Sequence, residues 1–253
     1  MEVQTIKKRG IYHQTRYENG QPKEQASYSD NGKRKWKIWY KNGQLKERHY
    51  HINGRYEGKF KEWYENGQPR VLQFYLNGRR EGEYKKWYDN GEVHETKFYI
   101  DGREEGISRI WYRNGNPQRE MSSRNGLLDG EFKVWHPNGQ LGQRGFFHDE
   151  NAEGIHEYWH ESGESAGREF YQKGKLEGER KSWYKNGQIS MKAVYWRGKL
   201  NGMREYWYEN GQMMSREFFE NERREGEYKR WDENGELLKH EFYRDDVPVM
   251  KIL

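Results

Sequence analysis

The chain has 253 residues, of which 32% are hydrophobic and 34% are charged, which excludes an ordinary aliphatic core. Mean hydropathy is -1.47. That value alone suggests disorder, but aromatic residues make up 16% of the chain, and each can bury about 150–250 Å². The net charge of +5 is a mild basic excess that does not require a nucleic-acid partner. There is no cysteine, which excludes disulfides and thiolate metal sites.

Residues 1–9 form a polar N-terminal lead-in without the apolar region of a secretory signal. No apolar stretch approaches the roughly 18 residues that a membrane span requires, so we expect no transmembrane segment. These features favour a cytoplasmic protein, or a virion-associated one if the source is viral. We place a repeat array at residues 10–243 and a C-terminal tail at residues 244–253, which is the most aliphatic segment.

The array has a period of about 24 residues, which is set by tryptophan and glycine and is typical of a solenoid or array. The tryptophan column is Trp39, Trp63, Trp87, Trp111, Trp135, Trp159, Trp183, Trp207 and Trp231. The glycine column is Gly43, Gly67, Gly91, Gly115, Gly139, Gly163, Gly187, Gly211 and Gly235. Gly20 precedes Gly43 by one residue less than the full period, so the first copy is slightly short.

One copy, residues 54–78, contains two Asn-Gly pairs, Asn66-Gly67 and Asn77-Gly78. Asn-Gly favours a type I′ hairpin turn, because both central residues need positive φ. The segments between these turns are rich in Tyr, Phe and Trp, which favour strands. The sequence therefore predicts an all-β fold: an elongated single-layer antiparallel meander of about ten 24-residue β-hairpin repeats.

Alternation along a strand distributes aromatic residues over both faces of the predicted sheet. Phe60 and Tyr64 share one face, Lys61 and Trp63 share the other, and neighbouring aromatics in the next strand split again. Cross-strand aromatic ladders are therefore expected to stabilise a single layer. A further glycine column is expected to leave room for a ring or a sharp twist; it comprises Gly58, Gly82, Gly106, Gly130, Gly154, Gly178, Gly202 and Gly226.

The pattern Gly-x-x-x-Gly-x-Tyr/Phe-x-x-Trp-Tyr-x-Asn-Gly-Gln resembles the MORN repeat. The clearest copies are residues 54–68, 78–92 and 174–188. The likeness is greatest to the variant found in antitoxin-like proteins of the YwqK family and in MORN paralogues of giant viruses. It implies elongated sheets that serve as scaffolds, dimerise or associate with membranes.

Some copies depart from this pattern. The position of Tyr64 is taken by His136, His160 and Asp232, the second turn loses its glycine at Glu150 and Glu222, and Ser122-Ser123 replaces the aromatic pair Phe74-Tyr75. We expect these copies to be locally weaker, with a bend or bulge within residues 140–167.

Four histidines, His136, His148, His156 and His160, raise the question of a metal site. Equivalent positions one repeat apart lie roughly 9–10 Å apart, whereas zinc needs nitrogens at about 2.0–2.1 Å. We therefore expect no metal, and interpret these histidines as replacements of surface tyrosine. The sequence has no phosphate loop and no nucleophile elbow, so we expect no enzymatic activity and no cofactor.

Two charged columns accompany the tryptophans. The candidate anion-contacting residues are Lys61, Lys85, Arg109, Lys133, Lys181 and Lys229, in a column interrupted by Glu157 and Glu205. An acidic column consists of Glu57, Glu81, Glu105, Asp129, Glu153, Glu177 and Glu225. Mutual neutralisation of the two columns is favoured over an anionic partner such as a lipid headgroup, and nucleic acid is the less favoured partner.

The tryptophan column itself is the candidate partner-binding strip, because long exposed apolar patches usually mark interfaces. Tyr75, Tyr99, Tyr171, Tyr195 and Tyr243 are expected to reach the same face. Structural ladder packing is the alternative interpretation. The sequence predicts a non-catalytic scaffold that binds another protein or a second copy as a homodimer. The alternatives are peripheral binding to anionic membrane lipids and antitoxin-like neutralisation of a partner protein.

Overall fold

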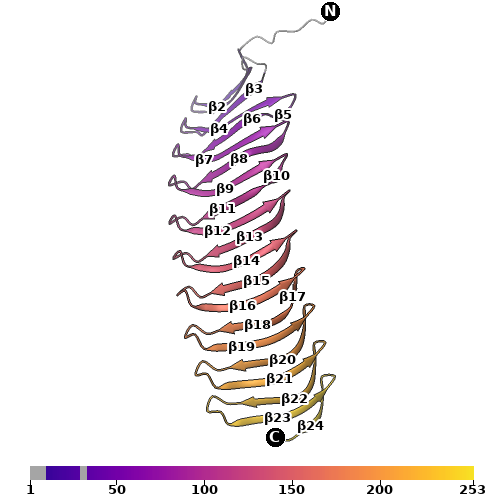
Figure 1. Ribbon diagram of the computed structural model, residues 1–253. Helices are drawn as coiled ribbons and strands as arrows, with labels where there is room; N and C mark the ends of the chain where they lie inside the picture. Colours follow the sequence, from indigo (N-terminus) through magenta and orange to yellow (C-terminus); the bar gives the residue numbers. More distant parts are fainter. Residues whose placement is uncertain (1–9, 29–32) are drawn as a thin grey trace, which may run out of the picture. The chain divides into compact units, whose positions relative to one another are not determined.

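A computed structural model describes residues 10–28 and 33–253, so the predicted lead-in 1–9 lies outside the described residues. All regular structure in the described part is strand, and no helix there could cross a membrane. The chain divides into two compact units, residues 1–127 and 128–253, each of which is a stack of antiparallel strands (Figure 1).

Unit 1 is a meander in which successive strands pair antiparallel. Its strands are β1 (Gly10–Arg16), β2 (Pro22–Tyr28), β3 (Arg34–Trp39), β4 (Leu45–Ile52), β5 (Arg55–Tyr56), β6 (Gly58–Trp63), β7 (Pro69–Leu76), β8 (Arg79–Trp87), β9 (Val93–Ile100), β10 (Arg103–Glu104), β11 (Gly106–Trp111) and β12 (Pro117–Arg124). The short strands β5 and β10 precede β6 and β11 and pair with the same neighbours.

Unit 2 repeats this arrangement. Its strands are β13 (Leu127–Trp135), β14 (Leu141–His148), β15 (Asn151–Trp159), β16 (Ser165–Gln172), β17 (Lys175–Leu176), β18 (Gly178–Trp183), β19 (Ile189–Trp196), β20 (Lys199–Trp207), β21 (Met213–Glu220), β22 (Arg223–Trp231), β23 (Leu237–Arg244) and β24 (Val247–Lys251). The segment expected to be a tail therefore contains a strand, β24. The predicted all-β antiparallel meander is confirmed in each unit.

The two Asn-Gly turns of a copy have different geometries. Asn77 and Gly78 both have positive φ, 50° and 84°, as the predicted type I′ turn requires. At the other turn only Gly67 is left-handed, with φ 86°. Its N–H donates to the Tyr64 carbonyl at 2.9 Å. This is a type I turn followed by a left-handed glycine, so the type I′ prediction is wrong there.

The copies that lack the second-turn glycine keep their turns. Glu150 and Glu222 adopt φ of 65° and 71°, and non-glycine residues reach that region at a cost of about 1–2 kcal/mol. A bulge does fall between Arg144 and Phe146. The expected bulge within 140–167 is therefore present, but a corresponding bulge between Gln73 and Tyr75 occurs in a regular copy, so it does not set this copy apart.

The register defines two faces of the sheet. Lys61 lies opposite Leu72, and Leu72 lies opposite Lys85; we call the face that these residues share with Trp63 the tryptophan face. Phe60, Gln73 and Tyr84 form the corresponding row on the other side, which we call the core face. The buried side chains of the described part lie on the core face: Ala26, His49, Gln73, Tyr99, Ser108, His156, Glu169, Ala193, Leu200, Ser215, Glu217, Phe219, Glu241 and Tyr243.

The tyrosines expected beside the tryptophans lie on the core face, so that expectation is wrong. Tyr75 pairs with Gly58 across the strands, and its ring centroid lies 5.0 Å from that of Tyr56. Tyr99 and Tyr243 are buried. In this strand the tryptophan face is occupied by the preceding residue, Phe74, which lies opposite Lys59.

The glycines of the Gly58 column are required by the backbone conformation and not by a ring packed against them. Gly58 has φ of 77° where β5 gives way to β6. At Gly82, Gly106 and Gly226 an added methyl group would meet nothing within 4 Å. The left-handed conformation therefore selects glycine at these positions, and the expectation of a ring packed against them is wrong.

Candidate interaction surface

Each tryptophan of the column ends a strand immediately before the first turn, and all nine are half-buried. Trp63, Pro69 and Trp87 line a shallow pocket of 300 Å³, so an apolar residue lies between successive indoles. Cations cover the rings: the Arg48 guanidinium lies 5.8 Å from the Trp63 ring and Lys85 Nζ lies 5.4 Å from the Trp87 ring. These contacts describe ladder packing.

A tyrosine beside the first turn of most copies, usually next to the tryptophan, joins its copy to the next. The Tyr64 hydroxyl donates to the carbonyl of Trp87 at 2.7 Å. The same hydrogen bond is made by Tyr17, Tyr40, Tyr88, Tyr184 and Tyr208. In two copies histidine takes this role, with Nε2 of His136 2.9 Å from the Trp159 carbonyl and that of His160 3.0 Å from the Trp183 carbonyl. These contacts support the interpretation of both histidines as tyrosine replacements.

Asp232, the third replacement at this position, acts differently. Its Oδ1 accepts hydrogen bonds from the backbone N–H groups of Asn234 at 2.9 Å and Glu236 at 2.8 Å. The carboxylate therefore caps its own turn, as short acidic side chains commonly do, and the turn geometry survives without the tyrosine.

The acidic column is engaged by the backbone. Glu57 Oε2 accepts the N–H of Asn77 in the following second turn at 2.8 Å. The same contact recurs for Glu81, Glu105, Glu153, Glu177 and Glu225. In these six copies the predicted neutralisation of the basic column by the acidic column is wrong, because the carboxylates bind turns and form no ion pair with the described residues of the basic column.

The basic column finds other partners in several copies. Lys133 pairs with Glu131 at 2.6 Å and Lys181 with Glu179 at 2.6 Å. Lys229 likewise pairs with Glu227 at 2.7 Å, and Arg109 pairs with Glu120 across the strands at 2.7 Å. Lys61 and Lys85 make no ion pair with any described residue. The six predicted cations therefore share one face, but four of them are neutralised by a carboxylate and two are not.

The most exposed aromatic column of the tryptophan face is phenylalanine, which sequence reasoning missed as a candidate. Phe98 is 44% exposed, and Phe146, Phe170 and Phe218 are similarly open. Ile107 and Ile155 flank this column and are 47% and 44% exposed. The alternation of Phe74 and Tyr75 carried the signal, because only one of two adjacent residues can face the core.

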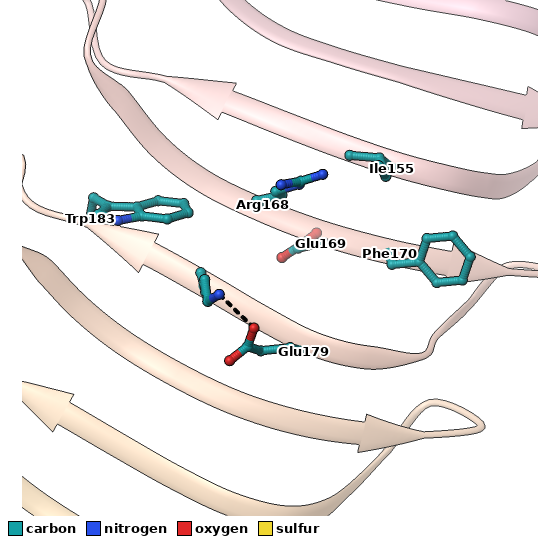
Figure 2. Close-up of a pocket in the computed structure, with 7 residues that line it drawn as sticks. Ile155, Arg168, Glu169, Phe170, Glu179 and Trp183 are labelled. Carbon is teal, nitrogen blue, oxygen red and sulfur yellow. Dashed lines mark ion pairs between the residues drawn. The ribbon is translucent and has the colours of Figure 1, made fainter.

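Two shallow pockets recur at the same place in different copies. The first has a volume of 330 Å³, and Figure 2 shows Trp183 at one end and Phe170 at the other, with Arg168 and Glu179 between them. The dashed ion pair is that of Glu179 with Lys181, at 2.6 Å. The second pocket, of 290 Å³, is lined in part by Phe98, Ile107, Lys85 and Thr96. The tryptophan face thus presents repeated shallow depressions that are lined by aromatic or aliphatic side chains and by charged groups of both signs.

Charged groups buried on the core face are matched by partners. Glu169 accepts hydrogen bonds from the hydroxyls of Tyr158 at 2.9 Å and Tyr171 at 2.8 Å, and it pairs with Arg180 at 2.8 Å. Burial, together with the bond to this carboxylate, raises the pKa of Tyr171 to about 12 and that of Tyr158 further still. The tyrosines therefore stay neutral donors, and this network is structural.

The four histidines do not come together. His136 and His160 bind tryptophan carbonyls, and His156 is buried with Nε2 3.0 Å from the carbonyl of Phe146. His148 instead lies among carboxylates, with Nδ1 3.5 Å from Asp129 and Nε2 3.8 Å from Asp149. The ligand atoms of these three residues fall within 4.8 Å of one another, and exposed acidic groups of this kind are common without a metal ion.

Comparisons with known proteins address the repeat. The MORN repeat variant matches at residues 12–30, 35–53, 56–77, 80–101, 104–125, 128–149, 176–197, 200–221 and 224–245. No curated protein matches. Among solved structures, a chain of the crystal structure of TcdB2-TccC3-Cdc42 is similar at 10% identity over 92% of this chain. The TM-score of 0.22 is too low to carry an argument, and the match spans 16% of that chain.

The family match agrees with the structural period. The matched segments begin at residues 56, 80, 104 and 128, and again at residues 176, 200 and 224, in step with the tryptophan column. MORN repeats commonly mediate protein or membrane-lipid interactions and generally form non-catalytic scaffolds. Both the sequence and the hairpin array lead to the same assignment: the chain belongs to the family of MORN repeat variant proteins.

Proposed function

We propose that this protein is a non-catalytic scaffold that binds a protein partner through the tryptophan face of unit 1. The observation that carries the proposal is the exposure of an apolar patch, defined here as Leu76, Phe98, Ile100 and Ile107. These side chains are 52%, 44%, 50% and 47% exposed, and they come from strands β7, β9 and β11. Large apolar side chains left open on a folded surface favour a binding role.

The chemistry around the patch favours a protein over an anionic bilayer. A membrane anchor buries its apolar groups about 5–10 Å into the headgroup region, which requires them to protrude. The patch residues instead belong to paired strands of the sheet and not to a protruding loop or helix. The exposed carboxylate of Glu83 lies opposite Phe98 of the patch, and an anionic surface would repel it.

The decisive experiment begins with identification of the partner by cross-linking in the source cells, followed by measurement of its affinity for the purified chain. We expect Phe98→Ala with Ile107→Ala to weaken that affinity by about tenfold or more, because truncating an interface anchor costs over about 1 kcal/mol. The matched control is Phe170→Ala with Ile155→Ala, which removes the same kinds of side chain from the tryptophan face of unit 2.

Two results would overturn the proposal. One is equal partner affinity for the wild type and the unit 1 variant. The other is that the wild-type chain floats quantitatively with phosphatidylserine vesicles at low salt whereas the unit 1 variant does not. That result would mean that the patch binds lipid and not a protein. Light scattering of the purified chain identifies a second copy as the partner. A toxin is one partner of the proposed class, and the family resemblance alone suggests it.

A further inference from the structure

On the neighbouring strands β3, β4 and β6 of unit 1, five cations of the tryptophan face have no carboxylate partner among the described residues. We call Lys35, Lys37, Arg48, Lys59 and Lys61 the basic cluster. Lys37 lies directly opposite Arg48, and Arg48 lies opposite Lys61. Lys35 and Lys59 stand two residues earlier on β3 and β6. The cluster therefore spans three neighbouring strands.

The repeat supplies its own control for this observation. The positions of Lys35 and Lys59 are occupied in unit 2 by glutamate in three copies, Glu131, Glu179 and Glu227, and by Ile155 and Met203 in the other two. Each of these glutamates pairs with the lysine two residues further on, at 2.6, 2.6 and 2.7 Å. Two lysines in unit 1 therefore stand where three copies of unit 2 carry the glutamate that neutralises the basic column, and the cluster is a change of charge sign at equivalent positions.

Aromatic rings hold these cations in place. Lys37 Nζ lies 5.9 Å from the Trp39 ring, the Arg48 guanidinium 5.8 Å from the Trp63 ring, and Lys59 Nζ 5.2 Å from the Phe74 ring. Contacts of this kind are worth about 0.5–1 kcal/mol at exposed sites. The cations are thereby restrained before any ligand arrives, which lowers the entropic cost of binding.

We propose that the basic cluster binds an acidic segment of the partner protein; this rests on the proposed function and names the partner's chemistry. Neighbouring strands lie about 4.8 Å apart, so the five charges fall within reach of a single short segment rich in Asp and Glu. The apolar patch begins on β7, the next strand after the cluster on the same face. The partner segment therefore combines carboxylates with an apolar anchor.

A single-stranded nucleic acid fits this surface less well. Such ligands need open aromatic faces on which bases can stack. Trp39, Trp63 and Phe74 are half-buried and lie beneath the cations. The exposed phenylalanine nearest to the cluster in sequence is Phe98 on β9, and it belongs to the apolar patch.

The test uses the full-length chain and a fluorescein-labelled oligoglutamate of about six residues, about 20 Å long when extended. We expect salt-dependent binding by fluorescence anisotropy and no binding of the matching oligoglutamine. Lys35→Glu with Lys59→Glu should weaken oligoglutamate binding by about tenfold or more. Folding of this variant is favoured because glutamate already occupies the equivalent positions in unit 2, and circular dichroism verifies it.

The matched control is Lys175→Glu with Lys199→Glu, two exposed lysines of unit 2 that carry the same change of net charge. Equal weakening by both double variants would overturn the inference, since the effect would then be net charge alone. The inference would also be overturned if the chain did not bind oligoglutamate but did bind phosphatidylserine vesicles or oligothymidylate. We expect Phe98→Ala with Ile107→Ala to leave oligoglutamate binding unchanged. Failure of the acidic-segment proposal can therefore be distinguished from failure of the proposed function of the apolar patch.

Discussion

At the scale of single residues, the hydroxyl of Tyr64 is the most informative group in the repeat. It reaches the carbonyl of Trp87 in the next copy, so one side chain ties two hairpins together beside their turns. The sequence identifies the Tyr column but not this bond, because its acceptor is a backbone atom of the following copy. At His136 and His160 an imidazole nitrogen makes the equivalent contact.

This equivalence yields a substitution pair. Tyr64→Phe removes the donor and should lower the free energy of unfolding by about 1 kcal/mol, the net value of a typical hydrogen bond. Tyr64→His should lose less, because imidazole makes the same contact at two other copies. Urea denaturation of both variants measures the difference. A Tyr64→His variant that is less stable than Tyr64→Phe contradicts the proposed equivalence.

A pH prediction follows from Tyr171. Burial and its bond to Glu169 raise its pKa to about 12, above the value near 10 of an unfolded chain. The folded state therefore favours the neutral phenol, whose contribution to stability is full below about pH 10 and is lost as pH rises towards 12. We expect the urea midpoint to fall across this interval, and to fall less steeply in Tyr171→Phe. Parallel pH profiles would show that Tyr171 is not responsible.

At the scale of elements, the period, the strands and the alternation of faces were predictable from the sequence, because they depend on local spacing. The turn types were not. Asn66-Gly67 and Asn77-Gly78 are the same dipeptide, and the difference lies in the flanking bonds of Tyr64 and Glu57. The face of Tyr75 also escaped prediction, since a bulge between Glu62 and Trp63 changes the residue count across the hairpin.

The glutamate that supports the second turn offers a test at this scale. Glu57→Ala removes the acceptor of the Asn77 N–H and should destabilise unit 1 by about 1 kcal/mol or more, because bonds to charged groups are among the stronger ones. Glu57→Gln retains an acceptor oxygen and should lose less.

Glu65→Ala serves as the charge-matched control, since Glu65 is an exposed residue of the first turn. Thermal unfolding of the three variants gives the ranking. A loss in Glu65→Ala as large as that in Glu57→Ala would mean that net charge, and not the turn bond, decides the stability.

At the scale of the whole molecule, the two units share one backbone pattern and differ in the charge of their tryptophan faces. The candidate site was only partly predictable for this reason. The tryptophan column and the basic column are visible as repeats, whereas the apolar patch and the basic cluster arise where copies deviate. Lys59 and Glu179 occupy equivalent positions. Whether a lysine or a glutamate at this position leaves a cation unpaired depends on the side chains that the strand register places beside it.

Because each copy of the array contacts only the copies next to it, we expect the fold to tolerate the loss of a whole copy. Deletion of residues 80–103 removes one full period and should leave a cooperatively folded β protein. Deletion of residues 80–91 removes one strand with its turn, so the next strand would run in the wrong direction. Circular dichroism and urea unfolding distinguish the two outcomes. Equal loss of structure in both deletions would argue against independent copies.

The bond from each tyrosine to the next tryptophan bears on how such an array changes in length. The donor is a side chain, whereas the acceptor is a main-chain carbonyl that every residue type provides. A duplicated copy therefore finds its acceptor without any compensating substitution in the copy that receives it. Unequal recombination between copies can lengthen or shorten such a gene while every junction in the protein remains satisfied.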